Sequence, residues 1–240
     1  MGRQRLIMEY ENPEIIEAAD NASKCILDQK SRNHVRDKFF PKMIDALGLK
    51  SGVEIGVDKG DFANHILNAS QIGKYYCVDT WQNDFGSDHR PDAYDKDGDN
   101  RFNGARTLLQ GHINDGRTSL LRMTSMAAST FFPKESLDFC YIDGDHSLEG
   151  IYMDLKAWIP KIRIGGIIAG HDYKDGHKSG INDYFGEQLD FHVKTAVDYF
   201  CRRYGYKLNV TGGLILSWWF VKNHHYVDTS EAHLLTNSYE

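Results

Sequence analysis

Residues 52–60, GVEIGVDKG, constrain the fold more than any other stretch of the chain. The apolar run predicts a buried strand, and Gly56 and Gly60 predict a turn before a helix over residues 62–68, with Asp61 placed to cap that helix. Because glycine has no Cβ, the backbone of such a turn can approach a ligand closely. The free N–H groups at a helix start also attract polar or anionic groups. These features predict an α/β fold with a ligand site at the turn.

An acidic residue stands at the end of the next predicted strand, at a sequence spacing typical of ribose-binding acids. Residues 74–78 form that strand, and Asp79 stands at its end, 23 positions after Gly56. An acid about 20 residues after the turn is suited to accept hydrogen bonds from a ribose diol. The spacing of Gly56 and Gly60 departs from Gly-x-Gly-x-x-Gly and lacks its tight pyrophosphate cradle. The turn therefore favours a nucleoside ligand without phosphates and disfavours a nicotinamide cofactor.

Strands and helices alternate along the remaining chain until two final strands over residues 207–211 and 214–221. The other predicted strands cover residues 119–123, 137–142 and 166–170, and further helices cover residues 101–113, 148–159 and 191–204. We expect Leu108 and Leu148 to face the core, Ser147 to cap its helix, and Trp218-Trp219 to supply one core and one exposed aromatic.

Composition narrows the function class. A chain of 240 residues with 41% hydrophobic residues fits one α/β domain. No apolar run is long enough for a membrane span or a signal peptide. The four scattered cysteines form no CxxC pair, which predicts reduced thiols and a cytoplasmic location. A net charge of −6 argues against nucleic acid as a substrate.

Titratable side chains gather where two predicted strands end. Asp143, Asp145 and His146 follow one strand, and His171 and Asp172 follow the next. Parallel sheets bind ligands at the carboxyl ends of their strands, so we expect these groups to lie together beside the glycine turn.

Four blocks of the sequence, at residues 52–60, 78–81, 141–147 and 165–173, together resemble the class I S-adenosylmethionine-dependent methyltransferases. The resemblance is to a small-molecule branch, some of whose members are related to sugar and macrolide O-methyltransferases, and it covers residues 50–222. It implies a doubly wound, Rossmann-like α/β sheet of seven strands, mostly parallel with an antiparallel last strand, and helices on both faces.

The resemblance also implies which residues contact the cofactor. Asp79 is expected at the ribose, Ser125 and Met126 beside the adenine, and Glu54 near the methionine end. The acid that the family often places near the adenine amine is absent from this turn, and Ser125 is equally suited to cap a short helix. The full implied set of cofactor-binding residues is Glu54, Gly56, Gly60, Asp79, Thr80, Trp81, Ser125, Met126 and Asp143.

Two mechanisms are open for the acidic and imidazole groups. In one, Asp143, His171 and Asp172 hold a divalent cation such as Mg²⁺, although a histidine departs from the all-oxygen pattern of related metal-dependent enzymes. In the other, no metal binds, and His171 or His146 acts as a general base oriented by a neighbouring carboxylate such as Asp143.

We therefore expect an S-adenosylmethionine-dependent methyltransferase that acts on the hydroxyl of a small polar acceptor. Transfer to nitrogen or carbon and a non-catalytic nucleoside-binding module are the alternatives, and a homo-oligomer is left open. The resemblance implies that residues 1–49, including a helix over residues 13–30, cover the site, and simple packing helices are the alternative. Residues 50–222 form the methyltransferase domain, and residues 223–240 a polar tail.

Overall fold

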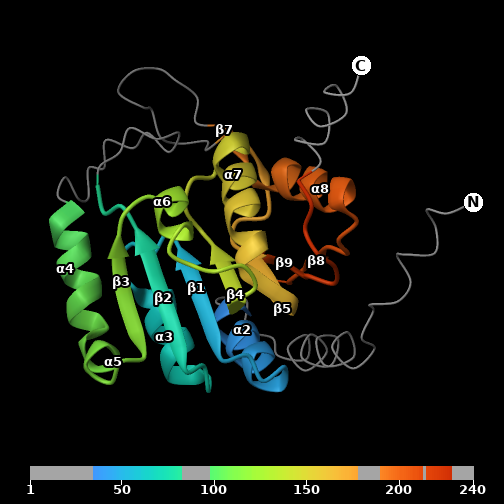
Figure 1. Ribbon diagram of the computed structural model, residues 1–240. Coiled ribbons are helices and arrows are strands. Elements are labelled where there is room, and N and C mark those ends of the chain that lie inside the picture. Colours follow the sequence, from blue (N-terminus) through green and yellow to red (C-terminus); the bar gives the residue numbers. More distant parts are fainter. Residues whose placement is uncertain (1–34, 83–97, 178–189, 213–214, 229–240) are drawn as a thin grey trace, which may run out of the picture.

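A seven-stranded mixed sheet organises the chain, which we describe from a computed structural model over residues 35–82, 98–177, 190–212 and 215–228 (Figure 1). The spatial order of its strands is β3-β2-β1-β4-β5-β9-β8. In chain order the strands are β1 (Ser51–Ile55), β2 (Lys74–Asp79), β3 (Thr118–Arg122), β4 (Leu137–Ile142), β5 (Ile162–Gly170), β8 (Asn209–Val210) and β9 (Trp218–Val221).

Only β9 runs against the other strands of this sheet. It pairs antiparallel with β5, where Ile168 lies opposite Phe220, and antiparallel with β8 on its other side. Strands β1 to β5 pair in parallel, and the central ones are almost wholly buried apolar runs, as expected for a sheet covered on both faces. The predicted fold, including its antiparallel last strand, is confirmed.

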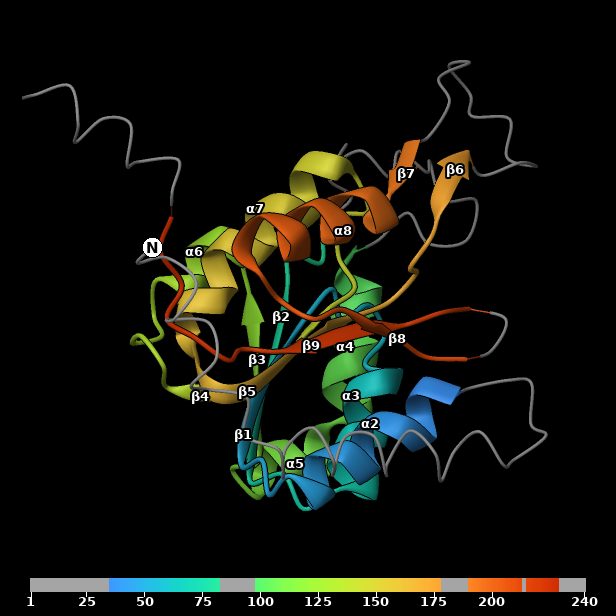
Figure 2. The ribbon, with the colours of Figure 1, turned by 90° about the vertical axis from the view of Figure 1, so that its right-hand side faces the viewer.

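Helices cover both faces of the sheet. Figure 2 shows α6, α7 and α8 on one side and α2 and α3 on the other. The helices are α2 (Val35–Ala46), α3 (Asp61–Ala69), α4 (Gly98–Leu108), α5 (Gln110–Asn114), α6 (Ser125–Ser129), α7 (Leu148–Trp158) and α8 (Val193–Tyr204). A 3-10 turn (Ile159–Lys161) follows α7, and β6 (Asp175–His177) pairs with β7 (Asp190–His192) as a separate ribbon.

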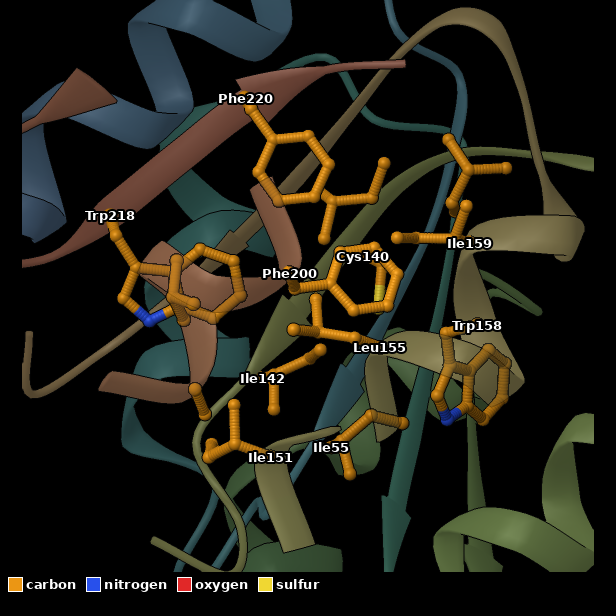
Figure 3. Close-up of a cluster of buried hydrophobic side chains, with 14 of the residues drawn as sticks. Ile55, Cys140, Ile142, Ile151, Leu155, Trp158, Ile159, Phe200, Trp218 and Phe220 are labelled. Carbon is orange, nitrogen blue, oxygen red and sulfur yellow. The ribbon is translucent and has the colours of Figure 1, made fainter. Parts of the chain in front are cut away.

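Two hydrophobic clusters fill the spaces between the layers. The first lies under α6, α7 and α8, and Figure 3 shows Trp158, Phe200 and Trp218 among its buried side chains. The second lies under α2, α3 and α4 and contains stacked or edge-to-face aromatic pairs such as Phe40–Tyr141. The sheet is therefore anchored on both faces, which fixes the positions of its strand ends.

Several local predictions were wrong. Asp61 is the first residue of α3, and Gly60 occupies the N-cap with a left-handed backbone. Leu108 and Leu148, expected in the core, are 41% and 47% exposed. Trp218 and Trp219 are both buried, although one of the two was expected to be exposed.

Other local predictions have mixed outcomes. Ser147 caps α7 as predicted, by accepting a hydrogen bond from Gly150 N. The predicted helix over 101–113 is divided into α4 and α5. Cys77, Cys140 and Cys201 are buried free thiols, as expected. The helix predicted over residues 13–30 and the tail beyond residue 228 lie outside the described residues.

The hairpin strand β9 also holds the edge of the sheet where His171 stands. The indole N–H of Trp218 donates to the backbone oxygen of His171 at 3.1 Å. We predict that Trp218→Phe lowers the free energy of unfolding by about 1 kcal/mol more than Trp219→Phe does, since both variants lose similar ring volume and the first also loses this bond. Urea denaturation of both variants measures the difference. Equal losses would contradict the prediction.

Candidate functional site

The glycine turn is held by the chain itself. Gly56 has φ +83°, and its N–H donates to Val78 O at 2.9 Å. A Cβ placed on Gly56 would lie 2.2 Å from the backbone oxygen of Asp143. The close approach that requires glycine here is therefore made by the segment that follows β4, whereas the sequence suggested a ligand in that position.

Asp79 closes the turn from the neighbouring strand. Its Oδ2 accepts the backbone N–H groups of Val57 and Asp58 at 2.8 and 2.9 Å, and its Oδ1 accepts the N–H of Trp81 at 2.7 Å. A carboxylate has about four acceptor positions. Asp79 therefore shapes the turn and keeps acceptor capacity for about one ligand hydroxyl.

Trp81 stabilises the same turn through its side chain. Its indole is 1% exposed, donates to Asp58 O at 2.7 Å and packs edge-to-face on Phe102. Both Asp58 and Trp81 have positive φ, at 50° and 44°. Residues held in this sparsely populated conformation concentrate at ligand sites. Thr80 accepts a hydrogen bond from Gln82 N at 3.3 Å.

Four titratable side chains meet at the ends of β4 and β5. His146 Nε2 lies 3.5 Å from both Asp143 Oδ1 and Asp172 Oδ2. His171 Nδ1 lies 3.6 and 3.5 Å from the same two oxygens. The strand ends thus bring together four of the five predicted groups, His146, His171, Asp143 and Asp172. We call these four residues the carboxylate–imidazole cluster. Asp145, the fifth predicted group, instead accepts the backbone N–H of Ser147 at 2.9 Å.

The outer oxygens of the two carboxylates pair with cations. Arg36 Nη1 donates to Asp143 Oδ2 at 2.9 Å, and Lys174 Nζ lies 3.3 Å from Asp172 Oδ1. Each carboxylate therefore directs one oxygen to a cationic side chain and one to the imidazoles. Arg36 comes from α2, outside every motif that the sequence drew attention to, and no local pattern distinguishes it from other basic residues.

These neighbours set the protonation of the cluster. Burial alone would raise the pKa of Asp143, but His146, His171 and Arg36 hold it well below its usual range. Burial lowers the pKa of His171, but Asp143 and Asp172 outweigh it and shift the pKa upward. The imidazolium form is therefore stabilised beside ionised carboxylates, which suits a group that accepts a proton.

Three members of the cluster are close enough together to contact one cation. The ligand atoms of Asp143, His146 and Asp172 all lie within 4.8 Å of one another. The prediction named His171 in the place that His146 takes in this group. Mixed imidazole and carboxylate donors suit zinc, manganese or iron better than magnesium.

Ser125 has a partner that the sequence did not indicate. Its hydroxyl donates to Asp154 Oδ1 and accepts the indole N–H of Trp158 at 2.8 Å. Thr124 caps α6 instead, so the alternative of Ser125 as the cap was wrong. An acid does stand beside this turn, supplied by α7. The sequence could have indicated this acid, because Asp154 falls on the apolar face of α7 between Ile151 and Trp158.

Burial dominates the chemistry of two further acids. Burial raises the pKa of Asp154 to about 7, although the Ser125 hydrogen bond opposes the shift. Burial and the charge of Asp143 raise the pKa of Glu54 well above its usual range, while Arg36 opposes them. Glu54 Oε2 has no hydrogen-bond partner among the described residues. Met126, by contrast, is 43% exposed in the first turn of α6.

Comparison with known proteins agrees with this geometry. A methyltransferase-domain family matches residues 53–173, which contain the glycine turn and the carboxylate–imidazole cluster. The chain belongs to this methyltransferase family. The prediction of a class I S-adenosylmethionine-dependent methyltransferase is confirmed, and Arg36 lies outside the matched segment.

Individual relatives are distant. An uncharacterized protein, y4gI, of Sinorhizobium fredii is 25% identical over 150 residues; the match covers 60% of this chain but only 16% of that protein. A Staphylococcus aureus structure, provisionally assigned as a caffeoyl-CoA O-methyltransferase, has a TM-score of 0.59 and 12% identity, with 90% of this chain and 95% of that chain covered.

A second solved structure is the O-methyltransferase from Bacillus cereus in complex with SAH, with a TM-score of 0.53, 14% identity, and 90% and 94% of the two chains covered. At such identities these two structures show the shared fold. In the described part of this methyltransferase, no helix is long and apolar enough to cross a membrane.

The contact between Gly56 and Asp143 predicts a stability effect. Gly56→Ala should lower the free energy of unfolding by roughly 1–3 kcal/mol more than Gly48→Ala does. Gly48 also has positive φ, at 62°, but has open space around it, so its variant measures backbone strain alone. Urea denaturation without ligand gives both values. A loss no greater at Gly56 than at Gly48 would show that the Asp143 segment yields without cost.

Asp154 predicts a pH effect. The folded chain keeps the Asp154 proton up to about pH 7, whereas an unfolded aspartate releases it near about pH 3.9. The folded state therefore binds more protons between these values, and this group's contribution to stability falls as pH rises through the window. In denaturant titrations at several pH values, Asp154→Asn should flatten that fall, and Asp61→Asn at an exposed position should retain it. A fall that persists in Asp154→Asn would contradict the assignment.

Proposed function

We propose that this methyltransferase transfers the methyl group of S-adenosylmethionine to a hydroxyl of a small polar acceptor. The observation that supports this most is the carboxylate–imidazole cluster, which lies at the same sheet edge as the glycine turn. It supplies groups that can accept a hydroxyl proton beside the position expected for the methyl donor. A nucleoside-binding module without catalysis has no use for such a cluster.

The residues along the sheet edge match the parts of the cofactor in order, with the ribose at β2 and the adenine beyond β3. Asp79 keeps an acceptor position for a ribose hydroxyl, and Gly56 and Gly60 shape the turn beside it. Ser125 and Met126 begin α6, just after β3, which pairs with β2, and the adenine is expected there. Asp154 reaches that turn through Ser125. When bound, S-adenosylmethionine supplies an electrophilic methyl group on sulfonium sulfur.

The chain's part in the reaction is to hold the acceptor and remove its proton. We assign the general base to His171, with His146 as its neighbour across the two carboxylates. The His171 imidazole would accept the O–H proton that the acceptor hydroxyl loses when it takes the methyl group supplied by the bound cofactor. Asp143 and Asp172 stabilise the resulting imidazolium.

A divalent cation is the competing proposal for the same residues. Asp143, His146 and Asp172 would hold it, and when bound it would lower the pKa of the acceptor hydroxyl. In that case His171 either adds a ligand or keeps its role as base. The nitrogen donors then favour a transition metal over Mg²⁺.

The proposal also covers the role of the N-terminal residues, the class of acceptor and the cellular location. Residues 1–49 are proposed to cover the site, which the contact of Arg36 with Asp143 supports. The net charge of −6 supports a small molecule rather than nucleic acid as acceptor, and the scattered cysteines support a cytoplasmic location. A homo-oligomer and methyl transfer to nitrogen or carbon stay open alternatives.

The base assignment predicts the behaviour of His171→Ala. With ¹⁴C-methyl S-adenosylmethionine and a panel of hydroxylated sugars and phenols, turnover should fall by roughly 10²–10⁴. The affinity for S-adenosylhomocysteine, measured by calorimetry, should stay within about threefold, since His171 touches the reacting proton and not the turn. His65→Ala, on the surface of α3, serves as the matched control.

Chelation separates the two mechanisms in the same assay. If His171 is the base without a metal, chelator leaves wild-type activity unchanged. If chelator abolishes activity and Zn²⁺ or Mn²⁺ restores it, the cation proposal replaces the metal-free one. Full activity of His171→Ala in an enzyme indifferent to chelator would contradict both. Absence of transfer and of S-adenosylhomocysteine binding in the wild type would contradict the proposed function itself.

A further inference from the structure

The order of strands in the sheet constrains where the methionine part of the cofactor can lie. This inference rests on the proposed function. Strand β1 lies between β2 and β4. If the ribose of the cofactor is at Asp79, at the end of β2, and its adenine is beyond it at β3, then the methionine part of the cofactor must extend past Gly56 toward β4. The first side chain at the end of β4 is Asp143.

A guanidinium stands at that place. Arg36 donates to Asp143 Oδ2 at 2.9 Å, and its Cζ lies 4.8 Å from the ring centroid of Phe62, in the first turn of α3. The side chain is 25% exposed, so it is held in position while still reachable. Its Nε also lies 3.5 Å from Asp37 Oδ1. A guanidinium has five donors in a planar fork, more than the contacts to Asp143 and Asp37 use, and this fork matches a carboxylate.

Acidic groups lie beside the guanidinium. Glu54 is 2% exposed at the end of β1, and its Oε2 has no hydrogen-bond partner among the described residues. It is close enough to Arg36 and Asp143 for their charges to influence its ionisation. With Asp143 and Asp37, three carboxyl groups lie beside the guanidinium. A cation beside carboxyl groups is complementary to a zwitterion that carries one carboxylate and one ammonium group.

We propose that Arg36 binds the α-carboxylate of the methionine part of the cofactor, while the carboxyl groups of Glu54 and Asp143 face its α-ammonium group. Helix α2 thus contributes a binding residue from outside the segment that the family shares. Of the two Asp143 oxygens, the Arg36 guanidinium contacts Oδ2. Asp143 Oδ1 therefore stays directed at the imidazoles of His146 and His171. Arg36 is therefore a binding residue for the methyl donor.

Three ligands and four forms of the full chain test the proposal by calorimetry. The ligands are S-adenosylhomocysteine, its carboxamide, which keeps the ammonium group but has no carboxylate, and 5′-methylthioadenosine, which has neither. The proteins are the wild type, Arg36→Gln, Arg36→Lys and Lys38→Gln. Lys38 is exposed on the same helix, so its variant makes the same charge change away from the site.

Arg36→Gln should weaken S-adenosylhomocysteine about 10- to 100-fold, as expected for a hydrogen bond to a charged group. It should leave the carboxamide and 5′-methylthioadenosine within about twofold of wild type, which also shows that the variant is folded. Arg36→Lys should show an intermediate loss, because it keeps the charge but not the fork. Lys38→Gln should bind all three ligands like wild type.

Several outcomes would overturn the inference. Unchanged S-adenosylhomocysteine binding in Arg36→Gln removes Arg36 from the site. Equal weakening of S-adenosylhomocysteine and its carboxamide shows that the variant acts through Asp143 and the ammonium group. Weakening of all three ligands in both Arg36 variants indicates general damage to the turn. If wild type binds 5′-methylthioadenosine and S-adenosylhomocysteine equally well, the tail has no site, while the nucleoside part of the proposed function stands. If wild type binds neither, the proposed function fails and the inference with it.

Discussion

The packing of the Asp143 backbone on Gly56 is the constraint on which the site depends. Asp143 N donates to Ile55 O at 2.7 Å, so the chain leaving β4 stays bonded to the end of β1 and passes directly over Gly56. His171 N donates to Ile142 O in the same manner one strand further on. Three strand ends are thereby locked together, and their side chains have little freedom in where they point.

Charge balance within this locked edge explains how four ionisable groups tolerate partial burial. Two carboxylates, Asp143 and Asp172, are matched by Arg36 and Lys174 on their outer side and by two imidazoles on their inner side. Unpaired charges at such depth would be costly. The outer cations come from α2 and from the segment after β5, so elements far apart in the chain must fold together before the cluster is stable.

Much of this could be predicted because strand ends and turns are local in sequence. Asp79, Asp143 and His171 each end an apolar strand, and parallel strands place such residues at one edge. Arg36 and Asp154 could not be found in the same way, since their contacts join helices to segments 107 and 29 residues away. The burial of Trp219 likewise depends on α2, whose Phe39 lies 6.0 Å from it between ring centroids, and no alternation pattern within one strand reveals that contact.

The division of each carboxylate between two partners has a consequence for selectivity. A carboxylate whose outer oxygen is paired with a cation presents one oxygen inward, which favours contact through a single oxygen. Any group that enters the cluster meets a single oxygen from Asp143 and a single oxygen from Asp172, with the imidazole nitrogens between them. This arrangement disfavours large ions such as Ca²⁺, which need many oxygen ligands. It favours small groups that form a few directional bonds.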